Sequence, residues 1–281
     1  MLDMRKHTVA AVATIGLLVP ATALAATING GPGNERLRGT AESDTIKGNG
    51  GNDRIFGFGA NDVLSGDAGN DRVFGAKGDD TIDGVQGNDL LNGGSGNDVI
   101  TGDGNGVGDR TSFDRIYGAS GNDTLTGGDS RDRIHGGSGD DTAHGENGND
   151  KMSCGGGNDT QTGGPGNDLI FANVGVDSTS GGDGNDTLWA LARKDVPLPG
   201  VDSLDGGNGN DRFRTRDGEP DNITCGPGDD RAVLDNVDVI TDATAENPNG
   251  SCERVDRRAP KSNDAKAEDA EQSPKEERVT S

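Results

Sequence analysis

An aspartate recurs every nine residues along most of this 281-residue sequence, and almost every copy follows a cluster of glycines. Carboxylates are oxygen ligands of the kind that Ca²⁺ prefers, and this ion takes six to eight oxygens at about 2.3–2.6 Å. Glycine turns add to the supply, because they permit positive φ and let backbone carbonyls converge on a small volume. The candidate metal ligands are Asp44, Asp53, Asp62, Asp71, Asp80, Asp89, Asp98, Asp114, Asp123, Asp132, Asp141, Asp150, Asp159, Asp168, Asp177, Asp186, Asp202, Asp211, Asp221 and Asp230.

These aspartates also have a purely structural explanation. An aspartate side chain stabilises a turn by accepting hydrogen bonds from its own backbone, and this needs no metal. Turn preference does not, however, require a single acidic position at a fixed spacing. The period therefore favours calcium binding, and a chain that folds equally well without calcium would favour the structural explanation.

The elements that position the aspartates follow from the same period. A unit of nine residues cannot bury an apolar face alone, so the repeats predict a solenoid of stacked turns. The most regular copies, GGSGNDVIT at 93–101 and GGPGNDLIF at 163–171, resemble the nonapeptide of secreted repeats-in-toxin (RTX, hemolysin-type) calcium-binding proteins. The resemblance extends from Gly30 to Val233. It implies an all-β fold, a parallel β-roll in which six-residue turns alternate with three-residue strands and hold Ca²⁺ between them.

Two nonapeptides make one rung of such a β-solenoid, so each ion is expected between residues 18 apart, such as Asp80 and Asp98. The eighth position of each unit predicts the buried row. Only 28% of the residues are hydrophobic, so this core is thin. The apolar members of the row are Ile46, Ile55, Leu64, Val73, Ile82, Leu91, Ile100, Ile116, Leu125, Ile134, Ile170 and Leu188.

Ala143, Gln161 and Thr179 interrupt that buried row, which makes the middle of the roll its weakest part. We therefore expect calcium to leave Asp141–Asp177 first. The two longest units contain extra residues around Asn105–Ser112 and Lys194–Val201. These residues are expected to loop out without breaking the ladder of strands.

The formal net charge of −23 limits the partners. About twelve Ca²⁺ ions would cancel this charge, and without them self-repulsion would keep the chain expanded. The free energy of ion binding is then free energy of folding, and we expect about twelve or more bound ions. The same charge argues against a nucleic acid or an anionic membrane as the partner.

The ends of the sequence differ from the repeats. Arg5 and Lys6 precede an apolar stretch at 9–19 and an Ala23-Leu24-Ala25 cleavage motif, which predicts a secretory signal peptide at 1–25. The stretch is too short for a membrane span. We therefore expect a secreted, extracellular protein with a β-roll at 26–233, a C-terminal cap at 234–256 and a disordered tail at 257–281.

The three cysteines predict one disulfide. Cys154 and Cys225 lie four rungs apart, roughly 19 Å at about 4.8 Å per rung, which is too far for a bond. Cys225 with Cys252 is the plausible pair, and it would join the cap to the end of the roll. Cys154 is then a free thiol that replaces a turn glycine.

Alternate units differ on their outer faces, because the seventh and ninth positions flank the buried eighth and point outward. One face has arginines and aromatic residues, which suit an adhesin or a polysaccharide-binding module that contacts sugars or acidic polymers. Arginines that offset the acidic turns and aromatics that stack for stability explain the same pattern. The other face has threonines and serines, which resemble the flat face of some ice-binding solenoids and are also common in strands.

Catalytic machinery is not evident in the sequence. The H-E-x-x-H motif and a serine on a strand-to-helix turn are both missing. The G-x-G-x-x-G matches are trivial in a chain with 50 glycines and do not precede a helix. We therefore expect a protein that is not an enzyme.

Overall fold

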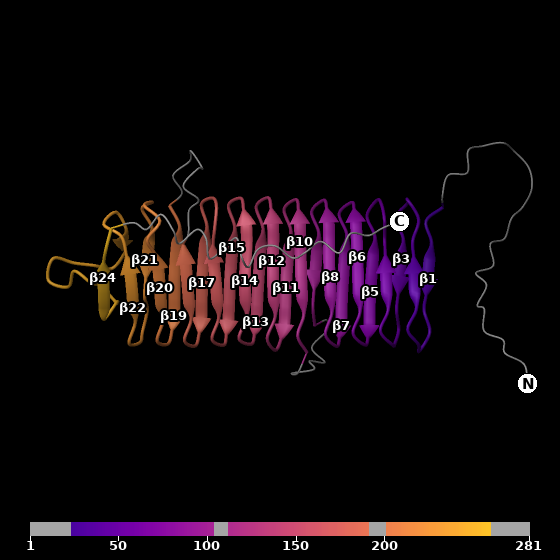
Figure 1. Cartoon of the computed structure of the whole chain (residues 1–281), viewed down its shortest axis with the longest axis horizontal. Helices are drawn as coiled ribbons and strands as arrows, with labels where there is room; N and C mark the ends of the chain where they lie inside the picture. Colours follow the sequence, from indigo (N-terminus) through magenta and orange to yellow (C-terminus); the bar gives the residue numbers. More distant parts are fainter. Residues whose placement is uncertain (1–23, 104–111, 191–200, 260–281) are drawn as a thin grey trace, which may run out of the picture.

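The computed structural model describes residues 24–103, 112–190 and 201–259. Two sheets of twelve parallel strands each lie along an elongated solenoid (Figure 1). The described residues contain no helix. The predicted fold class, an all-β parallel β-roll, is confirmed. The predicted signal peptide at 1–25 and the predicted tail at 257–281 fall almost entirely outside the described residues.

The odd-numbered strands form one sheet, which we call the hydroxyl sheet after its outer threonines and serines. Its strands are β1 (Thr27–Asn29), β3 (Thr45–Lys47), β5 (Val63–Ala68), β7 (Thr81–Gln86), β9 (Val99–Thr101), β11 (Thr124–Asp129), β13 (Thr142–Asn147), β15 (Thr160–Pro165), β17 (Ser178–Asp183), β19 (Ser203–Asn208), β21 (Asn222–Thr224) and β23 (Val239–Ile240).

The even-numbered strands form the second sheet, which we call the arginine–aromatic sheet. Its strands are β2 (Arg36–Arg38), β4 (Arg54–Phe56), β6 (Arg72–Lys77), β8 (Leu90–Ser95), β10 (Arg115–Ser120), β12 (Arg133–Ser138), β14 (Lys151–Gly156), β16 (Leu169–Ala172), β18 (Thr187–Ala190), β20 (Arg212–Thr215), β22 (Arg231–Leu234) and β24 (Arg254–Arg257).

The pairing register is 18 residues over most of the roll, as between Ile46 and Leu64. It rises to 25 at the two long units, where Leu91 pairs with Ile116 and Thr179 pairs with Leu204. Both ladders of strands therefore continue across the insertions. Residues 104–111 and 191–200, which contain most of the predicted loops, lie outside the described residues.

Many strands are longer than the three residues that the resemblance implies. In β5, for example, Asp67 and Ala68 of the following turn pair with Val85 and Gln86 one rung further on. The turns stack on one another with backbone hydrogen bonds, so the ladder continues into them. The chain thereby satisfies turn amides that would otherwise need water.

The eighth-position side chains are buried between the two sheets. They form two clusters, one that extends from Ile46 to Ile170 and one that extends from Leu188 to Cys252. Thr179 lies between the clusters and is 2% exposed, and its hydroxyl has no hydrogen-bond partner in the described chain. Gln161, one rung earlier, is also buried, and its Nε2 donates to the carbonyl of Phe171 at 3.0 Å. The thin core is therefore polar at one point.

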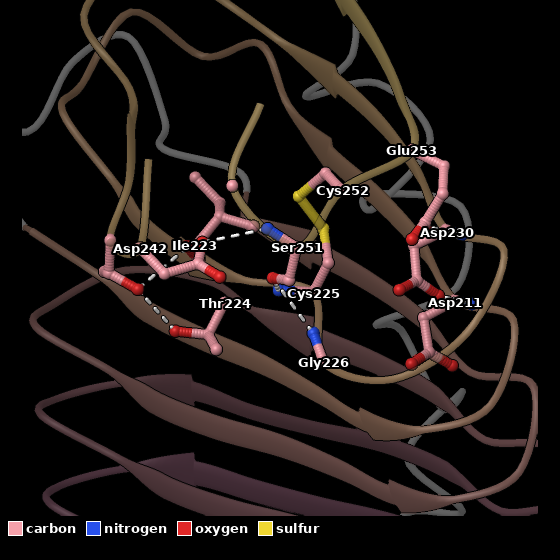
Figure 2. The surroundings of a disulfide bond; sticks show 12 residues. Asp211, Ile223, Thr224, Cys225, Gly226, Asp230, Asp242, Ser251, Cys252 and Glu253 are labelled. Atoms are coloured by element: carbon pink, nitrogen blue, oxygen red, sulfur yellow. Dashed lines mark hydrogen bonds between the residues drawn. A yellow bond between two sulfur atoms is a disulfide. The ribbon is translucent and has the colours of Figure 1, made fainter. Parts of the chain in front are cut away.

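The segment after Val233 extends both sheets by one rung, because β23 pairs with β21 and β24 pairs with β22. A disulfide joins Cys225 to Cys252, with 5.2 Å between the Cα atoms (Figure 2). The hydroxyl of Ser251 accepts the N–H groups of Cys225 and Gly226 at 3.1 and 3.2 Å. The loop before β24 is thus fixed to the turn after β21.

Cys154 is a buried free cysteine in the first position of its unit. Burial and the nearby carboxylates raise the pKa of its thiol well above the ordinary value. A thiol that stays protonated is a poor nucleophile. Cys154 therefore acts as a small buried side chain.

Candidate calcium sites

All twenty predicted aspartates lie at the end of a turn, immediately before a strand, and they form one column on each side of the roll. The backbone N–H of each member donates to the carboxylate of the member one rung further on, as from Asp62 to Asp80 Oδ1 at 2.8 Å. The first ladder precedes the hydroxyl sheet and contains Ala26, Asp44, Asp62, Asp80, Asp98, Asp123, Asp141, Asp159, Asp177, Asp202, Asp221 and Asp238. The second ladder precedes the arginine–aromatic sheet and contains Glu35, Asp53, Asp71, Asp89, Asp114, Asp132, Asp150, Asp168, Asp186, Asp211, Asp230 and Glu253.

The second carboxylate oxygen, Oδ2, lacks a hydrogen-bond partner in most of these aspartates. With the exceptions of Asp44 and Asp202, the Oδ2 atom of every predicted aspartate is buried and accepts no hydrogen bond from the described chain. A buried acceptor without a donor costs about 1–3 kcal/mol, and more when it is charged. A row of such atoms at a fixed position is what bound cations would satisfy.

The first glycine of each unit shows where the free oxygens point. A Cβ built on Gly75 would lie 2.1 Å from Asp80 Oδ2 and 2.7 Å from the carbonyl oxygen of Gly93. A Cβ on Gly57 would meet Asp62 Oδ2 at 2.2 Å. The free carboxylate oxygen and a backbone carbonyl of the next rung therefore both lie close to the same glycine. Only glycine leaves this space open.

Burial makes these carboxylates resist ionisation in the metal-free roll. Loss of hydration raises the pKa of Asp89, Asp114 and Asp150 to about 8, and neighbouring carboxylates of the same ladder add to the shift. A carboxylate in this state takes either a proton or a cation. The electrostatics and the missing hydrogen bonds thus point to the same need for positive charge.

The donor set distinguishes among metals. The described residues contain no group of three or more His, Cys, Asp or Glu side chains that would hold an ion without help from the backbone. A site here would combine ladder carboxylates with turn carbonyls, which is an all-oxygen set suited to Ca²⁺. Zinc sites use histidine and cysteine instead.

Asp44 differs from the other members of its ladder. Thr40 stands in the second position of this turn in place of a glycine, and its N–H donates to Asp44 Oδ2 at 2.5 Å. The Thr40 hydroxyl donates to Oδ1 at 3.2 Å. Because the chain itself satisfies this carboxylate, Asp44 is the weakest candidate ligand of the predicted set.

The residue before the aspartate has a role that the sequence analysis missed. The backbone N–H of Asn70 donates to Oδ1 of Asn52 at 2.8 Å, and that of Asn167 donates to Asn149 Oδ1 at 2.7 Å. In the asparagine column, the N–H of the later residue donates to the side chain of the residue one rung earlier. The aspartate ladders run the other way, because the N–H of the earlier residue donates to the carboxylate one rung later. The recurring Asn-Asp pair was the available signal.

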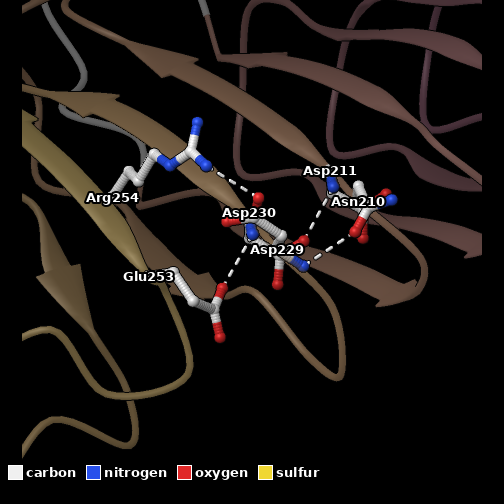
Figure 3. A network of polar contacts seen from close by, with 6 residues as sticks. All are labelled: Asn210, Asp211, Asp229, Asp230, Glu253 and Arg254. Carbon is white, nitrogen blue, oxygen red and sulfur yellow. Dashed lines mark hydrogen bonds and ion pairs between the residues drawn. The ribbon is translucent and has the colours of Figure 1, made fainter.

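Two further acidic residues end the ladders and were also missed. Asp238 Oδ1 accepts the N–H of Asp221 at 3.3 Å, and Glu253 Oε2 accepts that of Asp230 at 2.7 Å. Figure 3 shows the second of these contacts, beside an ion pair between Arg254 and Asp229 at 2.8 Å. The spacings of 17 and 23 residues break the period, so the series gave no sign of them.

The model of the RTX calcium-binding nonapeptide repeat matches residues 29–57, 56–91, 83–105, 111–143, 126–161, 155–188 and 199–219. The chain belongs to this family. The stacked aspartate ladders of this RTX roll are consistent with calcium binding. No curated protein sequence matches the chain. Among the described residues of this RTX protein, no helix has the length and hydropathy needed to cross a membrane.

Proposed function

We propose that this RTX protein is a secreted, non-enzymatic calcium-binding protein whose folding is driven by Ca²⁺ bound between stacked glycine-rich turns. The observation that carries the proposal is the row of buried Oδ2 atoms without a donor. Metal-free, the roll buries these oxygens at high cost. Calcium replaces the missing donors, so binding stabilises the folded state over the unfolded chain.

Each ion would lie between two rungs and take carboxylate oxygens from successive ladder members, such as Asp80 and Asp98, with carbonyls of the turns around them. The backbone amides of the ladder hold each Oδ1 in place, and the first-position glycines keep the space beside Oδ2 open. About twelve or more ions would neutralise the net charge of −23.

Secretion is part of the proposal and rests on the signal-like segment at 1–25. Sites of modest affinity, with Kd of roughly 10⁻⁴–10⁻³ M, suit extracellular calcium-binding modules. A chain with this charge would remain expanded before export and fold where calcium is abundant. Calcium would then not only stabilise the fold but also make the chain fold after export.

The test is circular dichroism of residues 26–281 during calcium titration, with reversal by EGTA. A cooperative gain of β signal at pH 8 with about twelve or more ions bound supports the proposal, and a spectrum that is already folded in EGTA at this pH overturns it. A screen against hydrolase and epimerase substrates tests the non-enzymatic part.

A matched pair of variants separates the ladder from general charge. Asp150→Asn keeps an acceptor for the N–H of Asp132 and replaces the free oxygen with an amide. Asp140→Asn removes one exposed charge and keeps the bond from the N–H of Asn158. We expect Asp150→Asn to raise the calcium midpoint and to lower the number of ions bound, with no change for Asp140→Asn.

A further inference from the structure

A groove with a volume of 410 Å³ crosses four rungs where the second ladder meets the arginine–aromatic sheet. Arg54, Arg72 and Arg115 line one side, and Leu90 stands in the arginine column between the last two. Phe113 lies at the end of the groove, with the guanidinium of Arg115 5.3 Å from its ring centre. The volume is within the range of small-molecule sites, roughly 300–1,000 Å³.

Two of the groove arginines, Arg54 and Arg72, differ from Arg115 and from several other cations of the same sheet, which contact aromatic rings. Arg36 and Arg38 contact the ring of Phe56, and Arg214 contacts the ring of Trp189 at 4.7 Å. The aromatic–arginine stacking alternative of the sequence analysis accounts for those residues. Within the described chain, Arg54 and Arg72 form no ion pair, hydrogen bond or ring contact.

The aspartates beneath the groove do not neutralise its surface by contact. Asp53, Asp71 and Asp89 are 1–2% exposed. Their Oδ2 atoms point toward Gly48, Gly66 and Gly84 inside the turns, because a Cβ on each glycine would lie 2.5 Å from the oxygen. The accessible charges of the groove are therefore the guanidinium groups.

The opposite side of the groove supplies neutral donors. The exposed side chains of Asn52, Asn70 and Asn88 line it, one per rung. Their Oδ1 or backbone groups hold neighbouring rungs together, as from the N–H of Asn88 to Asn70 Oδ1 at 2.7 Å. The Nδ2 groups of Asn52 and Asn70 donate to no atom of the described chain. Such amides suit the hydroxyls of a sugar.

We propose that this groove binds an acidic polysaccharide that runs along the solenoid axis, with its carboxylates on Arg72 and Arg115 and a sugar ring against Phe113. Arginine pairs with carboxylates through two parallel hydrogen bonds. Arg72 and Arg115 are two rungs apart, roughly 10 Å, so they suit a polymer with a carboxylate on alternate sugars. The arginine column, the asparagine amides and the ring of Phe113 favour this ligand over a neutral glycan or a protein.

The test measures binding of a glucuronate–N-acetylglucosamine hexasaccharide to the full chain by calorimetry, with an N-acetylglucosamine hexasaccharide as the neutral control. Measurements are made where circular dichroism shows the β-roll, so that a failure to fold with calcium is seen separately. Arg72→Gln with Arg115→Gln tests the groove. Arg212→Gln is the matched control, since it removes a charge from the same strand position at the other end of the sheet.

We expect the acidic hexasaccharide to bind, the neutral one not to bind, the double variant to lose at least tenfold in affinity and Arg212→Gln to be unchanged. No binding by a folded chain overturns the proposal. An equal loss in Arg212→Gln, or equal binding of an oligonucleotide of the same charge, also overturns it, because attraction would then be general to the face.

Discussion

Replacing Thr179 by valine should stabilise the roll, because it removes an unsatisfied hydroxyl from the core. The hydroxyl of Thr179 is buried without a partner between the two apolar clusters. An unsatisfied buried hydroxyl costs about 1–3 kcal/mol, and valine has nearly the same shape with an apolar methyl in its place. The free energy of unfolding should therefore rise by about 1–3 kcal/mol.

The choice of assay follows from the number of ions. If about twelve ions bind in one cooperative step, a gain of about 2 kcal/mol lowers the calcium midpoint only ~1.3-fold. Equilibrium unfolding in urea at fixed calcium reports the whole change instead. Thr124→Val is the control. Thr124 is exposed on the same sheet, so this substitution makes the same chemical change at the surface.

We expect the free energy of unfolding of Thr179→Val to rise and that of Thr124→Val to stay within about 0.5 kcal/mol of the parent protein. An unchanged or lowered stability for Thr179→Val would refute the reasoning, since it would mean that the hydroxyl finds a partner. The same hydroxyl lies beside the segment that we expect to release calcium first.

Gly75→Ala should lower the free energy of unfolding by about 1–3 kcal/mol and raise the calcium midpoint, because the new Cβ would lie 2.1 Å from Asp80 Oδ2. Gly156→Ala is the control, since a Cβ at Gly156 would have no atom within 4 Å, and it should not raise the midpoint. Cys252→Ser should lower the unfolding free energy by about 3.5 kcal/mol through loss of loop closure, as measured by urea unfolding with and without reductant. Burial raises the pKa of Asp150 to about 8 from an ordinary value of 3.8. Groups of this kind stabilise the metal-free roll fully below about pH 4 and lose that effect as the pH rises through their folded pKa. In EGTA, circular dichroism should therefore show more β structure at pH 5 than at pH 8, while the calcium midpoint rises as the pH falls.

Most of the fold could be predicted from the strict nine-residue period. It placed the buried row at Ile46, Ile55 and their successors, and it survived two insertions, because the parallel ladder resumes when Leu91 pairs with Ile116. It also placed the twenty aspartates in two columns. A period works this well because each rung contacts only its neighbours, so local register determines the whole structure.

The ends of the two ladders could not be predicted from the repeats, because the period changes there. Asp238 and Glu253 end the two ladders, but their units have other lengths and resemble no repeat. The length of the strands was missed for a different reason. Stacked turns gain hydrogen bonds only when neighbouring rungs are in place, as between Asp67 and Val85, and a single repeat contains no sign of them.

The balance of charge and burial supports the proposal that bound ions are needed for folding. Successive carboxylates of a ladder lie one rung apart, and two unit charges at about 4.8 Å repel by roughly 3.5 kcal/mol at an effective dielectric constant of 20. Each added rung brings two such repulsions, one in each ladder. Against them it buries two side chains such as Ile82 and Leu91, worth about 1.5–3 kcal/mol each.

Within fully charged ladders, repulsion of about 7 kcal/mol per rung thus exceeds the gain of about 3–6 kcal/mol from a core of this width, before the entropy of ordering 18 residues is included. Protonation removes the repulsion below the raised pKa of these carboxylates, and the proposed calcium ions would remove it once the carboxylates are ionised and would also provide a partner for Oδ2. The bonds from N–H to Oδ1 fix the geometry of the column but do not change its charge. This balance supports the proposal that the backbone determines the shape of the roll and that bound calcium stabilises it.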